Sequence, residues 1–254
     1  MKVTFLTHSA FLLEWDAFYM LFDCTFTEPY VSVLPALDAK KPLLVFSSHR
    51  HADHFDPKIF DLAAQYPLTR YFLSRDVNLS DKRRAEFGLT DAMMDRITLL
   101  RPNSGVTAEV AGKEISIRTV KSTDIGVAFL VKVDGELIYH AGDLNRWHWT
   151  DEGEDYCAKM AESYTRAIEK LAAAAAEELP SPLLTAAMIP FDTRLLDGYS
   201  LGALELLAAL PARHIFPMHM WEHFEYIDRF RTEHPAYAEA TANITANYQT
   251  FEIA

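Results

Sequence analysis

A continuous apolar run leads the chain directly into a dense group of side chains of the types that bind metals. Residues 43–48 read Leu-Leu-Val-Phe-Ser-Ser, and residues 49–54 read His-Arg-His-Ala-Asp-His. Unbroken apolar runs of this length are typical of a strand buried on both faces. Asp56-Pro57 then supplies a helix N-cap and a proline at the first helical position, which predicts a helix over residues 58–65. The group therefore lies on a loop between a buried strand and a capped helix.

Further strands and helices are predicted in two blocks. Short runs rich in β-branched, aromatic or apolar residues, bounded by turn residues, predict strands at 2–7, 10–15, 18–23, 113–121, 127–133, 136–141, 184–189 and 214–216. Helical patterns are found near 80–96 and at 160–179 and 201–210. The pair Asp134-Gly135 indicates a two-residue hairpin turn. Two blocks of strands with accompanying helices predict an α+β fold, a four-layered αββα sandwich, as a single domain over residues 1–254.

The histidine cluster has a spacing that coordination chemistry explains. His49 and His51 are two residues apart, and in an extended segment such residues point the same way and can hold one cation. The turn that follows would let Asp53 and His54 face a second position. Imidazole and carboxylate together suit zinc, which is the expected ion, with manganese and iron as alternatives. The competing interpretation is a surface cluster of histidines beside a helix cap.

The charge and the cysteines restrict the class of partner and the compartment. A formal net charge of −12 disfavours binding to nucleic acid or to anionic lipid, because like charges repel. We therefore expect a small-molecule substrate and neither nucleic acid nor membrane as partner, and a homo-oligomer stays open. Cys24 and Cys157 are the only cysteines, and they favour a reducing compartment with free thiols. Residues 1–8 show neither a signal peptide nor a membrane span, so we predict a cytoplasmic protein.

Three motifs, in the same order along the chain, resemble those of the metallo-β-lactamase superfamily. The segment His49-x-His51-x-Asp53-His54 resembles its signature motif. His140-Ala141-Gly142-Asp143 resembles the Gly-Asp that ends a strand and bridges two metals, and Phe216-Pro217-Met218-His219 resembles the late strand that ends in a metal-binding histidine. Thr7-His8-Ser9 and the N-terminal strands resemble the branch of bacterial lactonase-like hydrolases that act on sugar phosphates.

The resemblance implies roles for individual residues. One metal would bind His49 and His51, the other would bind Asp53, His54 and His219, and Asp143 would bridge them. Asp53 would also be catalytic, because it would orient a metal-bound hydroxide that attacks an ester, lactone or phosphoester. The implied function is a metal-dependent hydrolase acting on a small, anionic metabolite with one or two divalent ions.

One departure from the family pattern concerns the first metal. The family usually supplies a third histidine from the loop before the Gly-Asp hairpin, but residues 121–126 read Lys-Ser-Thr-Asp-Ile-Gly. Asp124 or another group could replace that ligand, the first ion could bind weakly, or the second ion could be the only one. The alternative function is a catalytically degenerate metal-binding or sensory protein of the same fold. A di-iron protein is a weaker alternative, because related di-iron proteins usually carry glutamate where His51 stands.

Four other positions have two interpretations each. His8 is interpreted as a buried or supporting histidine, with direct metal ligation as the alternative. The segment Trp147-His148-Trp149 either lines a substrate pocket or packs internally, and Arg194 either binds an anionic group or forms a surface ion pair. His223 is interpreted as a capping or surface residue, with a helical face shared with His219, four residues earlier, as the alternative.

Overall fold

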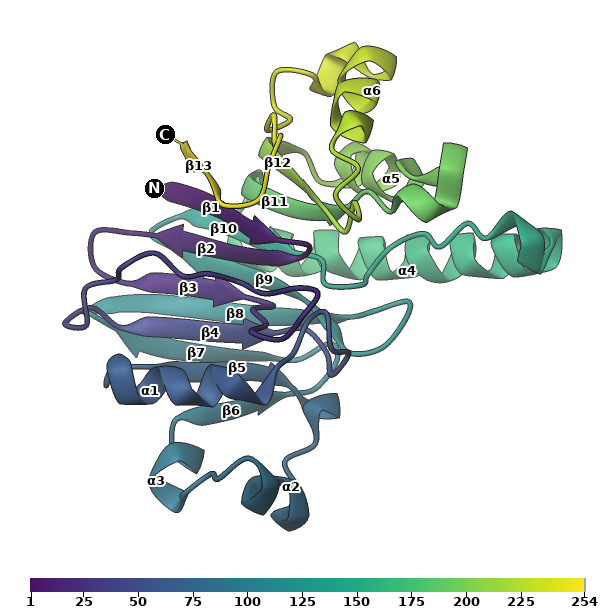
Figure 1. The fold of residues 1–254 in the computed structure, drawn as a ribbon. Coiled ribbons are helices and arrows are strands. Elements are labelled where there is room, and N and C mark those ends of the chain that lie inside the picture. Colours follow the sequence, from purple (N-terminus) through teal and green to yellow (C-terminus); the bar gives the residue numbers. More distant parts are fainter. Residues whose placement is uncertain (254) are drawn as a thin grey trace.

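Two β-sheets face each other in the computed structural model, which describes residues 1–253 (Figure 1). The first sheet has seven strands in the order β13-β1-β2-β3-β4-β5-β6. Its strands are β1 Lys2–Thr7, β2 Ala10–Glu14, β3 Tyr19–Phe22, β4 Leu43–Ser47, β5 Arg70–Ser74, β6 Ile97–Leu100 and β13 Gln249–Glu252. The second sheet has six strands in the order β12-β11-β10-β9-β8-β7. Its strands are β7 Gly105–Val110, β8 Lys113–Lys121, β9 Val127–Val133, β10 Glu136–His140, β11 Leu184–Pro190 and β12 Ala212–Met218.

Both sheets change from antiparallel to parallel pairing next to the strands that carry the predicted ligands. In the first sheet β1, β2 and β3 pair antiparallel, whereas β3, β4, β5 and β6 run parallel. In the second sheet β7 to β10 pair antiparallel, and β10, β11 and β12 run parallel. Parallel strands deliver their carboxyl ends to the same edge of a sheet. The segments after β10, β11 and β12 therefore emerge together, opposite the segment after β4.

The helices are α1 Leu62–Gln65, α2 Asp81–Glu86, α3 Asp91–Met94, α4 Glu154–Glu178, α5 Leu201–Ala209 and α6 Glu225–Glu233. Of these, α1, α4 and α5 cover the outer faces of the sheets, whereas α2 and α3 lie beyond β6 (Figure 1). The long helix α4 packs on β8 and β9, and α5 packs on β11. On the other side, α1 and the 3-10 turn before it bury Ile59, Phe60 and Leu62 against Val45 and Leu73 of the first sheet. The layers are thus helix, sheet, sheet and helix, which confirms the predicted αββα sandwich.

The core between the sheets is aromatic close to the site. Phe22 stacks on Phe46 with ring centroids 4.5 Å apart, and Phe46 meets Phe129 of the opposite sheet edge-on at 5.3 Å. All three side chains are fully buried. Aromatic pairs in such offset and edge-on arrangements add to the stabilisation from burial alone. They hold the carboxyl ends of β3 and β4 at a fixed distance from the second sheet.

Several predicted elements differ from the structure for identifiable reasons. The predicted helix near residues 80–96 is two short helices, α2 and α3, because Gly88 adopts a left-handed φ of +64° between them. The α4 helix begins at Glu154, six residues earlier than predicted, with Glu154 and Asp155 placed favourably at its positive end. Strands β5, β6, β7 and β13 and helix α6 were not predicted, and most of these are short. Within residues 1–253 no helix is long and apolar enough to cross a bilayer.

Two glycines allow the backbone of the second sheet to approach Ser48 closely. Ser48 is the residue just before the histidine cluster. Gly126 has φ +74°, and a Cβ there would lie 2.2 Å from the Ser48 carbonyl oxygen and 2.5 Å from the His49 Cβ. Gly142, with φ +52°, would place a Cβ 2.5 Å from the Ser48 Cβ. Only glycine combines the left-handed conformation with so close an approach of two backbones. The motif's Gly142 is therefore required by packing as well as by its turn.

We predict that Gly126→Ala lowers the free energy of unfolding by about 2–5 kcal/mol, through backbone strain and a clash with Ser48. Gly135→Ala is the matched control, because Gly135 also has a left-handed φ, of +81°, but has no atom within 4 Å of a Cβ. Gly135→Ala should lower the free energy of unfolding only by the backbone strain, about 1–2 kcal/mol. Urea unfolding of both variants measures the difference, and equal losses would contradict the packing argument.

Candidate metal centre

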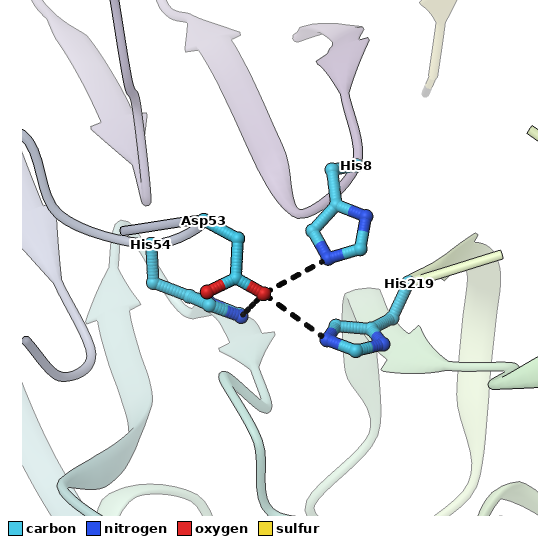
Figure 2. Close-up of side chains that lie close together, drawn as sticks. All are labelled: His8, Asp53, His54 and His219. Carbon is cyan, nitrogen blue, oxygen red and sulfur yellow. Dashed lines mark ion pairs between the residues drawn. The ribbon is translucent and has the colours of Figure 1, made fainter. Parts of the chain in front are cut away.

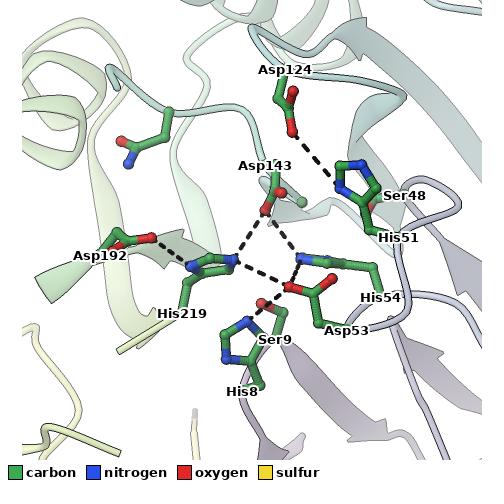
Figure 3. A network of polar contacts seen from close by, with 12 residues as sticks. His8, Ser9, Ser48, His51, Asp53, His54, Asp124, Asp143, Asp192 and His219 are labelled. Atoms are coloured by element: carbon green, nitrogen blue, oxygen red, sulfur yellow. Dashed lines mark hydrogen bonds and ion pairs between the residues drawn. The ribbon is translucent and has the colours of Figure 1, made fainter. Parts of the chain in front are cut away.

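Four segments bring seven side chains of the types that can bind metal to one edge of the sandwich. All of them except His49 are labelled in Figures 2 and 3. The turn between β1 and β2 carries His8, and the turn after β10 carries Asp143. The end of β12 carries His219, and the loop after β4 carries the other four. These four are His49, His51, Asp53 and His54. The structure thus brings together all six predicted ligands and adds His8.

The first group of ligand atoms comes from His49, His51 and Asp143. The His49 Nε2 lies 3.0 Å from the His51 Nδ1 and 3.3 Å from the Asp143 Oδ2. His49 and Asp143 are buried, whereas the His51 side chain is 46% exposed. His49 and His51 therefore converge on one position, as their spacing in the sequence predicts.

The second group comes from His8, Asp53, His54 and His219. The Asp53 Oδ2 lies 3.3 Å from the His8 Nε2, 3.6 Å from the His54 Nε2 and 3.7 Å from the His219 Nε2 (Figure 2). The second carboxylate oxygen of Asp143, Oδ1, lies 3.1 Å from the His54 Nε2 and 3.5 Å from the His219 Nε2. Asp143 therefore presents one oxygen to each group, which is the position of a bridging ligand.

Several ligand atoms are buried without a hydrogen bond. Among the described residues, the Nε2 atoms of His8, His54 and His219 and the Oδ1 of Asp143 have no hydrogen-bond partner. Each such group costs about 1–3 kcal/mol of desolvation when nothing replaces the lost water. Four of them at one point form a donor set that a divalent cation would satisfy at once. The residues present therefore fit the metal that the motif implies.

Two buried carboxylates orient the imidazoles from behind. The His54 Nδ1 lies 2.7 Å from the Asp23 Oδ2. The His219 Nδ1 lies 2.9 Å from the Asp192 Oδ2 (Figure 3). Each Nδ1–H donates to its carboxylate, which leaves the Nε2 lone pair directed at the cluster. Asp23 also accepts hydrogen bonds from the Ser48 backbone nitrogen and hydroxyl, at 2.7 and 2.6 Å. No sequence motif predicted a role for Asp23, although this residue follows β3, the strand that pairs with the one leading into the histidine cluster.

The charges in the cluster shift the pKa values of its members strongly. Burial alone would raise the pKa of Asp143, but the neighbouring His54 and His219 hold it well below its usual value. Burial alone would lower the pKa of His54, but the nearby charge of Asp143, together with the charge and hydrogen bond of Asp23, raises it well above its usual value. Burial lowers the pKa of His8 to about 4. The pKa of His219 is likewise raised by Asp143, Asp192 and Asp53. A cation bound in the cluster would take the place of the positive charge that these shifts favour on the two histidines.

The loop that lacks the third histidine presents Asp124 to the first group. The Asp124 Oδ2 lies 3.8 Å from the His51 Nδ1, and its side chain is partly exposed. Ser122 is buried, and its hydroxyl accepts a hydrogen bond from the Asp124 backbone nitrogen, so it is turned into the loop. Of Ser122 and Asp124, only Asp124 directs its side chain towards His51 of the first group.

Two other histidines have structural roles. His140 is fully buried, donates its Nε2–H to the Ser9 carbonyl oxygen at 2.9 Å, and accepts from the Gly142 nitrogen at 3.1 Å. Both ring nitrogens of His140 are thus engaged away from the first group. His223 is exposed and pairs with Glu225 at 2.9 Å, in agreement with its interpretation as a surface residue.

A cavity of about 310 Å³ opens over the cluster, with Asp53, Asp143 and His219 in its lining. Its walls include Trp147, Trp149, Tyr156, Met160, Arg194 and Trp221. Trp147 and Trp149 both belong to the lining, and their rings are parallel with centroids 6.2 Å apart. The Arg194 guanidinium lies 4.4 Å from the centre of a Trp221 ring and 5.4 Å from that of Trp149. It also binds both oxygens of Asp192.

The chain belongs to the family described as the beta-lactamase superfamily domain, whose model matches residues 2–154. This confirms the superfamily that the three motifs predicted. A curated relative from Opitutus terrae, described as a UPF0173 metal-dependent hydrolase, is 30% identical over 156 residues. The alignment covers 56% of this chain and 63% of that relative, so the chain spans less than two thirds of the relative's length.

Solved structures share the fold. Igni18, described as a metallo hydrolase from the hyperthermophilic archaeon Ignicoccus hospitalis, gives a TM-score of 0.61 at 19% identity over 100% of this chain and 99% of its own. CmlA, described as a diiron β-hydroxylase from Streptomyces venezuelae, gives 0.61 at 12% identity over 99% of this chain and 54% of its own. At these identities the likeness shows the fold alone.

We predict that Asp124→His raises the metal content of the purified protein towards two ions per chain. An imidazole at this position, next to His51, would supply the third histidine that the first group lacks. Metal analysis after dialysis measures the content, and Asp16→His, at an exposed turn, is the control. A variant no richer in metal than the wild type would mean that position 124 does not reach the first group.

Proposed function

We propose that this protein is a metal-dependent hydrolase that cleaves an ester, lactone or phosphoester bond in a small, anionic metabolite. One observation carries the proposal: two groups of ligand atoms share Asp143 and lie at the base of a cavity large enough for a metabolite. The description of the Opitutus terrae relative as a metal-dependent hydrolase supports it. The lactonase-like branch suggested by the N-terminal motif belongs to this proposal and not to the established family membership.

The six predicted residues His49, His51, Asp53, His54, Asp143 and His219 would hold one or two divalent ions, with zinc expected and manganese or iron as alternatives. A bound cation would lower the pKa of water and polarise the scissile oxygen. Asp53 would act beside it, because its carboxylate belongs to the second group and also lines the cavity, where it could orient the attacking water. Burial of the donor set keeps bulk water from competing for these charges.

The cavity wall supports an anionic substrate. In a chain of net charge −12, Arg194 supplies a positive charge directly beside the cluster. The Asp192 carboxylate and the Trp149 and Trp221 rings hold the guanidinium in place, and its side chain is still 46% exposed. A fixed guanidinium binds carboxylate or phosphate with good geometry. Arg194 thus serves as both an internal ion-pair partner and a candidate anion anchor.

A catalytically degenerate metal-binding or sensory protein is the second candidate. The absence of a histidine from residues 121–126 favours it, because a weakly ligated first ion would leave the site incomplete. Metal analysis of untreated protein, followed by a panel of lactones, carboxylic esters and phosphoesters, separates the two. Turnover that depends on added metal supports the hydrolase, whereas a metal-loaded protein inert on the whole panel supports the second candidate.

We predict that Asp53→Ala lowers turnover by at least about 10²-fold on any substrate from this panel, because it removes a ligand and the group that orients water. The fold should persist, since the Asp53 side chain lies at the cavity and contributes no core volume. Circular dichroism checks the fold. Asp81→Ala, an exposed carboxylate on α2, is the control and should retain full turnover. Full turnover by Asp53→Ala would refute the proposed chemistry.

We predict that Arg194→Gln raises KM for an anionic substrate about 10–100-fold, which corresponds to the loss of a charged hydrogen bond. An uncharged ester with the same scissile bond should show a much smaller change in KM. Steady-state kinetics on the pair of substrates separates charge recognition from a general disturbance of the site. Arg213→Gln, at an exposed position of β12, is the control. Equal effects on both substrates would remove Arg194 from substrate recognition.

A further inference from the structure

His8 lies in an unusual backbone position at the tip of a tight hairpin. Thr7 pairs with Ala10, so His8 and Ser9 form a two-residue turn between β1 and β2. His8 has φ +46°, a left-handed conformation that glycine and asparagine prefer in such turns. For another residue this conformation costs about 1–2 kcal/mol. A strained residue of this kind at a cluster of ligands suggests a functional constraint on its side chain.

Both residues of the hairpin turn accept hydrogen bonds from the second sheet or from the residue that follows β12. The His8 carbonyl oxygen accepts a hydrogen bond from the His219 backbone nitrogen at 3.0 Å. The Ser9 carbonyl oxygen accepts from the His140 Nε2 at 2.9 Å. His140 directly precedes the turn that carries Asp143. The backbone that bears His8 is therefore held to both segments of the second sheet that supply ligands.

The imidazole of His8 is enclosed by rings. Its centroid lies 4.2 Å from that of His219 and 4.8 Å from those of Tyr30 and Trp221. The side chain is 4% exposed, and the buried Nε2 has no hydrogen-bond partner among the described residues. This nitrogen points at the Asp53 Oδ2, as Figure 2 shows. Burying a polar atom without a partner is unfavourable unless something else binds it.

The separations in the second group match those between ligands of one cation. Bonds of the lengths typical of zinc sites place tetrahedral ligand atoms roughly 3.3–3.4 Å apart. The Asp53 Oδ2 is 3.3, 3.6 and 3.7 Å from the Nε2 atoms of His8, His54 and His219. From this geometry we infer that His8 is a metal ligand of the second group, supplied by the first hairpin of the chain. The inference rests on the proposal that the cluster holds a metal.

With His8 as a ligand, the second group has more protein ligands than the first. The second group then has His8, Asp53, His54 and His219 together with an oxygen of Asp143, which encloses an ion in protein ligands. The first group has His49, His51 and Asp143, and His51 and Asp143 line the cavity. Closed sites hold their metals firmly, whereas sites with three protein ligands and one open position are typical of catalysis. Because Asp53 and His219 of the second group also line the cavity, both groups face it. The structure thus assigns the firmer retention of metal to the second group and the open ligand position to the first.

The test measures metal binding and ligand field, not turnover. His8→Asn removes the imidazole while keeping a residue that tolerates the left-handed turn. Cobalt(II) is titrated into metal-free wild type and variant in competition with a chelator, and the visible absorption of the one-cobalt protein is recorded. We expect the affinity for the first cobalt to fall at least about tenfold. Loss of a residue that only hydrogen-bonds to a metal ligand already lowers metal affinity by about that factor, so loss of a ligand should lower it at least as much. We also expect the visible bands to shift in position and intensity.

Two further variants make the result decisive. His223→Asn, at an exposed histidine, should bind cobalt like the wild type. His8→Gly removes the side chain and relieves the turn, and free imidazole added to it should restore the wild-type bands. Circular dichroism confirms that each variant is folded.

Each outcome decides between named possibilities. Unchanged affinity and unchanged bands in His8→Asn would overturn the inference, and so would weaker binding with unchanged bands, because His8 would then only position Asp53. Failure of imidazole to restore the bands in His8→Gly would count against direct ligation. If the wild type binds no divalent cation, the proposed metal site itself fails, which is distinguishable from a failure confined to His8.

Discussion

The buried carboxylate of Asp23 is the interaction on which the site depends. It lies at the carboxyl end of β3 with no solvent exposure, and it accepts hydrogen bonds from the backbone and hydroxyl of Ser48 and from His54. A buried charge without such partners would cost several kcal/mol, so the chain after β4 is held where it can supply them. Ser48 is also the residue onto which Gly126 and Gly142 close. One carboxylate thus links the first sheet, the motif loop and the two turns of the second sheet.

The centre concentrates features that oppose stability elsewhere in proteins. His8 and His219 both have a left-handed φ, and several ligand atoms are buried without hydrogen bonds. The negatively charged carboxylates of Asp53 and Asp143 also approach the same atom, the His54 Nε2, at 3.6 and 3.1 Å. Strain and unpaired charge of this kind persist only where the surrounding structure holds them. The two-sheet core of aromatic and aliphatic side chains supplies that support. A bound cation would relieve both the repulsion and the missing hydrogen bonds.

Local chemical patterns were sufficient to predict much of the fold and most of the candidate site. The run at residues 43–48, the Asp134-Gly135 turn and the cap at Asp56 each correspond to the element they predict, because each depends on neighbouring residues only. Strands such as β6 and β13 are four residues long, partly exposed and weakly patterned, so their pairing with distant partners decides them. Whether Asp53, His54 and the other cluster residues bind metal stays a prediction, although the structure places them as the motif implies.

The sequence by itself determined the ligand types, the order of the three motifs and the absence of a third histidine from residues 121–126, because these are properties of residue identity and spacing. Only the tertiary structure decided that Asp23 and Asp192 orient the imidazoles, that Asp124 lies beside His51, and that His8 turns its Nε2 into the cluster. These relations join residues far apart in the chain. They depend on how two sheets and their connecting turns pack, and no local pattern records that packing.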